Sequence, residues 1–275
     1  MKKRIFVTGG ASGLGREIAL RWARDGALIC IGDLNDARGQ ETLDLIKAAG
    51  GEGIYRHCDV TKLEDLQAVA GELLREWGGV DVVFNNAGVG TAGALASETI
   101  EQWQWVLDIN LLGVVRGCQA FAPVFKAQGK GHFVNTASMA GLVHPPMMGS
   151  YNAVKAAVVA FSETLRVELA PNNIGVTVVC PSFFRTNLTE SLRSPAAAAK
   201  IERLFEKAPI TAAEIADRIY RAVETNQYLL LPHAGDRKAY FFKRFMPVNA
   251  YLNFMTRKTR SFHKLGQSQS GKATK

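Results

Sequence analysis

The strongest constraint on the fold of this 275-residue chain is a repeated alternation of short apolar runs and longer amphipathic segments. The apolar runs predict strands at residues 4–8, 27–31, 54–58, 80–84, 132–135, 175–179 and 228–231. Strands that are apolar along their whole length are typical of a parallel sheet covered on both faces. The pattern therefore predicts an α/β fold: a single doubly wound parallel sheet of about seven strands with helices on both faces.

Positive charge is concentrated at the C-terminal end. Of the 33 basic and 25 acidic residues, ten basic and one acidic lie from Asp236 to Lys275, so the remainder is nearly neutral. We therefore expect a domain at 1–235 and a basic, aromatic-rich tail at 236–275, with 267–275 disordered. A neutral body argues against a nucleic-acid partner.

The tail has an amphipathic pattern. Tyr240–Met246 is rich in aromatic residues, and Val248, Tyr251, Leu252 and Met255 repeat at helical spacing after a proline. The flanking basic residues are Lys243, Arg244, Arg257, Lys258, Arg260 and Lys264. Such a segment fits peripheral contact with an anionic membrane and packing against a neighbouring subunit equally well.

Other features of the sequence indicate the cellular compartment of the protein. No apolar run approaches the roughly 18–20 residues that span a bilayer, and the basic start is followed by too short an apolar stretch for a signal peptide. We expect a cytoplasmic protein, with contact at the inner face of a membrane left open. Its scattered cysteines, Cys30, Cys58, Cys118 and Cys180, indicate reduced core thiols and no metal site.

A glycine-rich turn, Thr8–Gly15, joins the first strand to the first helix. Glycines let the main chain approach a pyrophosphate, and the helix N-terminus provides free N–H groups, so the turn predicts a Rossmann-type dinucleotide site. Asp33 ends the second strand, where a carboxylate accepts hydrogen bonds from an adenosine ribose and repels a 2′-phosphate. This favours NAD over NADP. Alternatively Asp33 caps the next helix, although Asn35 and Asp36 could do so.

A second group of polar residues follows the fifth strand. Tyr151 and Lys155 are four residues apart in a predicted helix and so share one face. Ser138 lies at the carboxyl edge of the sheet, where folds of this kind bind ligands. An ammonium beside a phenol stabilises the phenolate, so we expect Lys155 to lower the pKa of Tyr151.

With these motifs, the chain resembles the short-chain dehydrogenase/reductase family over about residues 4–232. The matching segments are Thr8–Gly15, Asp59-Val60, Asn85–Gly88, Asn110, Ser138, Tyr151 with Lys155, and Pro181–Thr186. The resemblance implies hydride transfer between NAD and a secondary alcohol or ketone, and a homodimer or homotetramer. One position departs from the family, which commonly has Pro-Gly where this chain has Pro181-Ser182.

The resemblance also implies catalytic roles. Tyr151 would be the general acid and base, and Lys155 would lower its pKa and bind the nicotinamide ribose. Ser138 would hold the substrate oxygen. Asn110 would support a water that links Lys155 to solvent.

The same resemblance assigns residues along a cofactor cleft. Those implied around the diphosphate are Gly9, Ser12, Gly13, Leu14 and Gly15. Those implied along the adenosine are Asp33, Asp59, Val60, Asn86, Ala87 and Gly88. Thr186 would reach the nicotinamide carboxamide.

The segments expected near the nicotinamide are apolar. They are His144–Met148 and the loop after the sixth strand, with Phe183, Phe184, Leu188 and Leu192. We therefore expect a small hydrophobic substrate, with packing against the sheet or a partner as the alternative for some of these side chains. Arg185 could bind a carboxylate or lie on the surface, and His144 could line the pocket or face solvent.

Three functions remain open. The leading hypothesis is an NAD-dependent oxidoreductase acting on a hydrophobic secondary alcohol or ketone. The second is an NADP-dependent carbonyl reductase, against which Asp33 argues. The third is a non-catalytic cofactor-binding module that acts through partners or membranes, against which Ser138, Tyr151, Lys155 and Asn110 argue.

Overall fold

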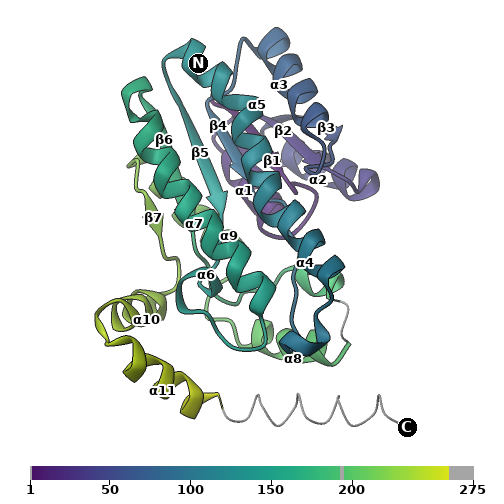
Figure 1. Ribbon diagram of the computed structural model, residues 1–275. Helices are drawn as coiled ribbons and strands as arrows, with labels where there is room; N and C mark the ends of the chain where they lie inside the picture. Colours follow the sequence, from purple (N-terminus) through teal and green to yellow (C-terminus); the bar gives the residue numbers. More distant parts are fainter. Residues whose placement is uncertain (1, 193–194, 260–275) are drawn as a thin grey trace.

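The computed structural model describes residues 2–192 and 195–259. Within these residues one sheet of seven parallel strands lies at the centre, in the order β3-β2-β1-β4-β5-β6-β7 (Figure 1). The strands are β1 (Arg4–Thr8), β2 (Leu28–Asp33), β3 (Glu52–His57), β4 (Val82–Asn85), β5 (Gly131–Thr136), β6 (Ile174–Val179) and β7 (Leu229–Leu230). The predicted doubly wound sheet is confirmed, with strand boundaries shifted by one or two residues.

Helices surround the sheet. They are α1 (Gly13–Ala23), α2 (Asp36–Ala48), α3 (Leu63–Trp77), α4 (Ile100–Leu107), α5 (Gly113–Gln128), α6 (Ala140–Val143), α7 (Gly149–Leu169), α8 (Pro195–Glu206), α9 (Ala212–Glu224), α10 (Ala234–Phe245) and α11 (Val248–Lys258). Short turns are η1 (Leu95–Ser97), η2 (Asp108–Leu112), η3 (Ala170–Asn172) and η4 (Asn187–Ser191). Glycines in the left-handed conformation end α3 and α5, at Gly78 and Gly129.

Two apolar cores lie on opposite faces of the sheet because side chains alternate along each strand. Ile5 and Val7 of β1 pack in the core beneath α1, α2 and α9. Phe6 points to the other face, where α3, α5 and α7 pack and where its ring lies 5.0 Å from that of Phe121. The four cysteines are buried and free, as predicted.

The sheet has its topological switch point at β1, which pairs with β2 on one side and β4 on the other. The connections from these two strands leave on opposite faces, so a crevice opens at their carboxyl ends. The glycine-rich turn after β1, the segment after β4 and the segment after β5 all meet at this edge.

Two features differ from the sequence-based expectation. Helix α8 was not predicted. Helix α10 begins at Ala234, slightly before the expected tail boundary at 236. Helices α4 and α5 are joined by the π-helical turn η2.

The two tail helices extend from the sheet beyond β7 (Figure 1). Helix α11 follows Pro247, in agreement with the helical spacing in the sequence. None of the helices in the described part of the chain has the length and apolarity needed to cross a membrane. The expected disorder at 267–275 concerns residues outside the described part.

Candidate active site

A cavity of about 1010 Å³ lies at the carboxyl edge of the sheet. Most of the site residues expected from the sequence line it. They are Gly9, Ser12, Gly13, Leu14, Asp33, Asp59, Val60, Asn86, Ala87, Gly88, Ser138, Tyr151, Lys155 and Thr186. The two that do not line it are Gly15 and Asn110. Residues up to 177 positions apart along the chain thus meet at one site.

The glycine-rich turn has no room for side chains. Gly9 has a φ of +65°, and a Cβ there would lie 2.8 Å from the Cα of Ala87. A Cβ on Gly15 would lie 2.1 Å from the carbonyl oxygen of Gly9. Gly15 therefore lets α1 pack against the turn and acts behind the cavity wall.

The N-terminus of α1 points its main-chain N–H groups to this cavity. No side chain caps the helix at Ser12, so the first N–H groups retain their capacity to donate. Together with the positive end of the helix dipole, they fit a diphosphate. The closely packed glycines, the uncapped helix and the carboxylate at the end of β2 are the features that a bound dinucleotide requires.

The carboxylate of Asp33 lines the end of the cavity next to β2 and the glycine-rich turn. Its Oδ2 accepts a hydrogen bond from the N–H of Ala11 at 3.0 Å, and its Oδ1 accepts one from the N–H of Asn35 at 3.0 Å. Each oxygen retains a lone pair for a ribose hydroxyl. The alternative role in helix capping belongs to Asn35, whose Oδ1 accepts from the N–H of Arg38.

One basic residue near Asp33 was missed by the sequence analysis. Arg38, in the first turn of α2, lines the cavity. Its guanidinium forms a bidentate pair with Glu190 of η4, at 2.9 and 3.1 Å. The position of Arg38 shortly after β2 could have indicated that it lies near Asp33. Its partner, 152 residues away in the chain, was not predictable.

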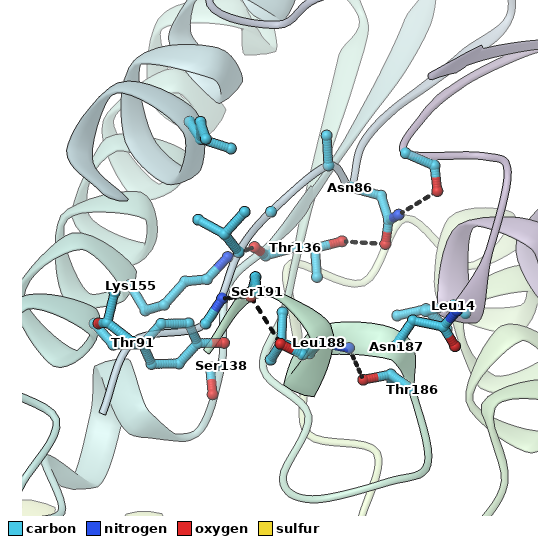
Figure 2. A pocket seen from close by; sticks show the side chains of 18 of the residues that line it. Leu14, Asn86, Thr91, Thr136, Ser138, Lys155, Thr186, Asn187, Leu188 and Ser191 are labelled. Carbon is cyan, nitrogen blue, oxygen red and sulfur yellow. Dashed lines mark hydrogen bonds between the residues drawn. The ribbon is translucent and has the colours of Figure 1, made fainter. Parts of the chain in front are cut away.

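Asn86 and Thr8 hold the two central strands together at the switch point. The Thr8 hydroxyl accepts from the N–H groups of Asn86 and Ala87 at 3.0 and 3.1 Å. The Asn86 side chain donates to the carbonyl of Thr8 and accepts from Thr136 (Figure 2). The Asn86–Gly88 segment thus lines the cavity, and its hydrogen bonds hold the ends of β1, β4 and β5 together.

Ser138, Tyr151 and Lys155 lie together at the opposite end. Tyr151 and Lys155 are buried in α7, and the Lys155 Nζ donates to the carbonyl of Thr136 at 2.7 Å (Figure 2). The Ser138 hydroxyl accepts from the N–H of Ala140 at 3.1 Å. Helix α6 packs so closely on α7 that a Cβ on Gly141 would lie 2.5 Å from the carbonyl carbon of Lys155, which holds this part of α7 in place.

The expected direction of the tyrosine pKa is wrong for the polypeptide itself. Burial raises the pKa of Tyr151 to about 12, and the hydrogen bond with Ser138 opposes this only in part. The Nζ of Lys155 is 5.8 Å from the Tyr151 ring centroid and is engaged by Thr136. Burial also lowers the pKa of Lys155 to about 8. Desolvation thus outweighs the attraction that the sequence suggested.

Asn110 occupies the π-helical turn η2 and is fully buried. Its side chain forms two hydrogen bonds with the main chain of Val89, each 2.8 Å long. It therefore holds the segment after β4 that lines the cavity. A π-helical turn at this point is typical of functional sites, although the spacing of Asn110 in the sequence does not predict it.

The loop after β6 folds over the cavity. Thr186 begins η4 and lies beside the glycine-rich turn, since a Cβ on Gly13 would be 3.7 Å from its Cβ. Ser191 accepts from the N–H of Gly90 and donates to the carbonyl of Leu188 (Figure 2). These contacts hold the loop against the segment after β4.

Ser182, which replaces the family's common glycine, has a specific partner. Its backbone φ is not positive, so a side chain is accommodated without strain. Its hydroxyl donates to Oδ1 of Asp236 at 2.5 Å, and the other carboxylate oxygen lies 3.3 Å from Nδ1 of His233. The substitution therefore links the loop after β6, which lines the cavity, to the start of α10.

Apolar side chains line the rest of the cavity. Those expected from the sequence are Pro145, Met148, Phe183, Phe184, Leu188 and Leu192. Those missed are Trp105, Ile109, Met139, Val143, Ile201 and Phe205. Phe205 comes from α8, and its ring lies 6.3 Å from that of Phe183. The spacing of Ile201 and Phe205, four residues apart, was a weak signal of that helix.

Two polar candidates lie outside the cavity lining. Arg185 is exposed, in agreement with its surface alternative. His144 is exposed and does not line the cavity, in agreement with its solvent-facing alternative. Its Nε2 lies 3.1 Å from the carbonyl of Gly141, and its Nδ1 lies 2.7 Å from Nζ of Lys243. Lys243 of α10 therefore contacts this turn, which the sequence did not predict.

Comparison with solved structures and curated proteins agrees with this geometry. A short chain dehydrogenase/reductase from Burkholderia phymatum, in complex with NAD, superposes with a TM-score of 0.83 at 32% identity, covering 88% of this chain and 93% of that one. A 2,5-dichloro-2,5-cyclohexadiene-1,4-diol dehydrogenase of Sphingobium indicum is 35% identical over 191 residues, 68% of this chain and 75% of that protein. The probable oxidoreductase EphD of Mycobacterium bovis is 36% identical over 231 residues, 80% of this chain.

The chain spans only 39% of the length of EphD, so that relative contains further sequence. A family model described as short chain dehydrogenase matches residues 3–197, which hold the glycine-rich turn and all four residues expected to be catalytic. The chain therefore belongs to the short-chain dehydrogenase family, whose members are NAD(P)-dependent oxidoreductases.

Proposed function

We propose that this protein is an NAD-dependent oxidoreductase that interconverts a hydrophobic secondary alcohol and its ketone. The observation that carries the proposal is the position of Ser138, Tyr151 and Lys155 on the same cavity as Asp33 and the glycine-rich turn. A non-catalytic cofactor-binding module would not require these three polar groups at the end opposite the adenosine site.

The residues divide the chemistry between them. During reduction the Tyr151 hydroxyl donates a proton to the carbonyl oxygen of the substrate, and the Ser138 hydroxyl donates a hydrogen bond to the same oxygen. A pKa of about 12 keeps Tyr151 protonated at neutral pH, as a proton donor must be. During oxidation Tyr151 accepts the alcohol proton, and the Lys155 ammonium stabilises the phenolate. A dinucleotide held by Asp33 and the glycine-rich turn would supply the hydride chemistry, and the positive charge of its oxidised ring would favour the phenolate.

NAD is the proposed cofactor. Asp33 would accept hydrogen bonds from the ribose hydroxyls and repel a 2′-phosphate. Arg38, the basic residue that would favour NADP, is neutralised by Glu190. The NADP-dependent carbonyl reductase is the second candidate, and the observation that favours it is the presence of Arg38 on the cavity wall.

The apolar lining supports a hydrophobic substrate. Phe183, Met148 and Phe205 line the cavity, and the cationic side chains that line it, among the described residues, are Lys155 and the paired Arg38. A carboxylate-bearing substrate is therefore disfavoured. We further propose that the protein is a homodimer or homotetramer, as is common in this family.

The cofactor proposal is tested by titrating the full chain with NADH and NADPH in parallel, following energy transfer from its tryptophans. We expect tighter binding of NADH, by about tenfold or more, because a 2′-phosphate beside Asp33 is repelled. Equal or tighter binding of NADPH would favour the reductase candidate. Failure of both to bind would favour the non-catalytic module.

The catalytic proposal is tested with Tyr151→Phe, which removes the acid and base and keeps the ring. Turnover of the best substrate from a panel of apolar secondary alcohols should fall about 10²–10⁴-fold, with NADH affinity nearly unchanged. Tyr220→Phe, on α9 and outside the cavity lining, is the matched control. Retained turnover in Tyr151→Phe would refute the mechanism.

A further inference from the structure

Helices α10 and α11 carry an unusual density of exposed apolar side chains. These are Phe241, Phe242, Phe245, Val248, Leu252 and Phe254, each between 40% and 76% exposed. They are six of the fifteen large apolar side chains found exposed in the described chain. The other nine are spread from Leu34 to Phe183, so this set forms a local surface, which we call the aromatic face.

The aromatic face is preorganised. The rings of Phe241 and Phe245, one helical turn apart, are stacked with centroids 6.2 Å apart. The rings of Phe242 and Phe254 meet edge to face at 5.1 Å and join α10 to α11. Because these exposed rings already restrict one another, they lose little further conformational entropy when they bind another surface.

Positive charge surrounds the aromatic face. No acidic residue occurs from Arg237 to Lys258, while six basic residues do. The preceding acid, Asp236, is buried and bonded to Ser182. Lys243 is turned inward to Leu142 and His144, which leaves the other five cations at the surface. The partner that fits is therefore both anionic and apolar.

The opposite side of the two helices is bound to the catalytic domain. The Tyr251 hydroxyl donates to the carbonyl of Val143 at 2.5 Å, and Lys243 donates to the carbonyl of Leu142. Val143 itself lines the cavity. The aromatic face is therefore exposed, while α10 and α11 contact the Leu142–His144 turn beside the cavity. The two helices lie beyond β7 at one side of the molecule (Figure 1).

These observations choose between the possible occupants. A second copy of the same face would bring two sets of cations together. The segment 260–275 carries basic residues and no acidic ones, so charge disfavours it as well. A nucleic acid would satisfy the charge but not six apolar side chains. We propose that the aromatic face binds the surface of an anionic lipid bilayer, with its phenylalanines at the boundary between headgroups and acyl chains.

This proposal extends the proposed function, on which its consequence for the substrate rests. Because the helices that bind the bilayer also contact the Leu142–His144 turn, the cavity mouth would lie close to the lipid. A hydrophobic alcohol or ketone dissolved in the bilayer is then the substrate class that the site would take.

Cosedimentation with vesicles tests the proposal with the full chain. The vesicles are phosphatidylcholine alone, or phosphatidylcholine with phosphatidylglycerol at a ratio of about two to one. We expect binding to the second kind that weakens with added salt, and little binding to the first. The double variant Phe245→Ser/Leu252→Ser should bind at least about tenfold more weakly, because two exposed apolar anchors are lost.

The control removes the same kind of side chain elsewhere. Leu74→Ser/Val167→Ser changes residues that are 47% and 72% exposed on α3 and α7 and should bind lipid as the original chain does. The proposal is overturned if the original chain stays in the supernatant with phosphatidylglycerol, or if Phe245→Ser/Leu252→Ser binds equally well. Light scattering tests the alternative that the aromatic face is a subunit interface. That alternative would hold if the original chain bound no lipid and formed an oligomer that dissociates in Phe245→Ser/Leu252→Ser and not in the control.

Titration with NADH on the same samples separates this proposal from the dehydrogenase assignment. NADH binding with no lipid binding would overturn only the membrane proposal. Lipid binding without NADH binding would overturn only the proposed function and leave the bilayer contact standing.

Discussion

At the scale of single residues, environment decides the properties of the candidate site more than residue type does. Tyr151 and Lys155 are four positions apart, yet burial moves the pKa of both toward their neutral forms, to about 12 and about 8. Arg38 lines the adenosine end, yet its charge is compensated by Glu190. In each case the sequence identifies the group, and its neighbours determine what it can do.

The pair between Arg38 and Glu190 leads to a prediction about cofactor selectivity. Glu190→Gln should free the guanidinium to contact a 2′-phosphate and tighten NADPH binding about two- to fivefold, since exposed ion pairs are worth about 0.2–1 kcal/mol. NADH affinity should change little. Parallel fluorescence titrations measure both.

Glu41→Gln provides the control for that experiment. Glu41 lies on α2 with Arg38, but its carboxylate pairs with Arg16. An equal loss of NADH and NADPH affinity in Glu190→Gln would mean that the pair only holds η4 in place. Selectivity would then rest on Asp33 alone.

At the scale of elements, the strands place polar groups inside the sheet as well as at its edge. His132 of β5 is buried, and its Nε2 lies 2.8 Å from the hydroxyl of Thr177 on β6. Burial lowers the pKa of His132 to about 4, and the charges of Arg166 and Lys3 act in the same direction. A buried neutral histidine makes the stability of the sheet depend on pH.

The sign of this dependence follows from the two states. An unfolded histidine has a pKa of about 6.5, so the unfolded chain binds the proton first as the pH falls. The contribution of neutral His132 is complete above about pH 6.5 and is lost between there and about pH 4, up to about 3 kcal/mol. Urea unfolding in this pH range should show a smaller loss for His132→Gln than for the original chain.

His57→Gln, which removes an exposed histidine at the end of β3, serves as the comparison. An unchanged pH profile in His132→Gln would mean that other groups cause the acid destabilisation.

At the scale of the whole molecule, the tail and the cavity are connected. Ser182 follows β6 on the nicotinamide side, and its hydroxyl donates to Asp236 in the first turn of α10. His233 is bonded to the same network, with its Nε2 3.1 Å from the carbonyl of Phe183. The tail helices therefore contact two segments beside the cavity: the loop after β6, through this network, and the Leu142–His144 turn.

Removing that link should affect stability and cofactor binding together. Asp236→Ala deprives the partly buried Ser182 hydroxyl of its acceptor, so the free energy of unfolding should fall by about 1–3 kcal/mol. The rise in melting temperature on adding NADH should also be smaller than in the original chain, because the loop after β6 is less firmly held. Thermal unfolding with and without NADH measures both effects.

Asp217→Ala is the matched control, since Asp217 forms a partly exposed surface pair with Arg21. If NADH raised the melting temperature of Asp236→Ala as much as that of Asp217→Ala, the network would be a structural support with no effect on the cofactor loop.

The sequence by itself determined the parallel sheet, the glycine-rich turn and the set of residues that meet at the cavity. These depend on local chemistry: apolar runs form buried strands, and positions after parallel strands converge at one edge whatever the details of packing. Only the tertiary structure decided the pairing of Arg38 with Glu190, the bond between Ser182 and Asp236, and the apolar wall contributed by α8. The raised pKa of Tyr151 belongs with these, because it depends on burial by distant segments. Contacts between residues far apart in the chain leave no periodic pattern to read, and so they appear only once the chain is folded.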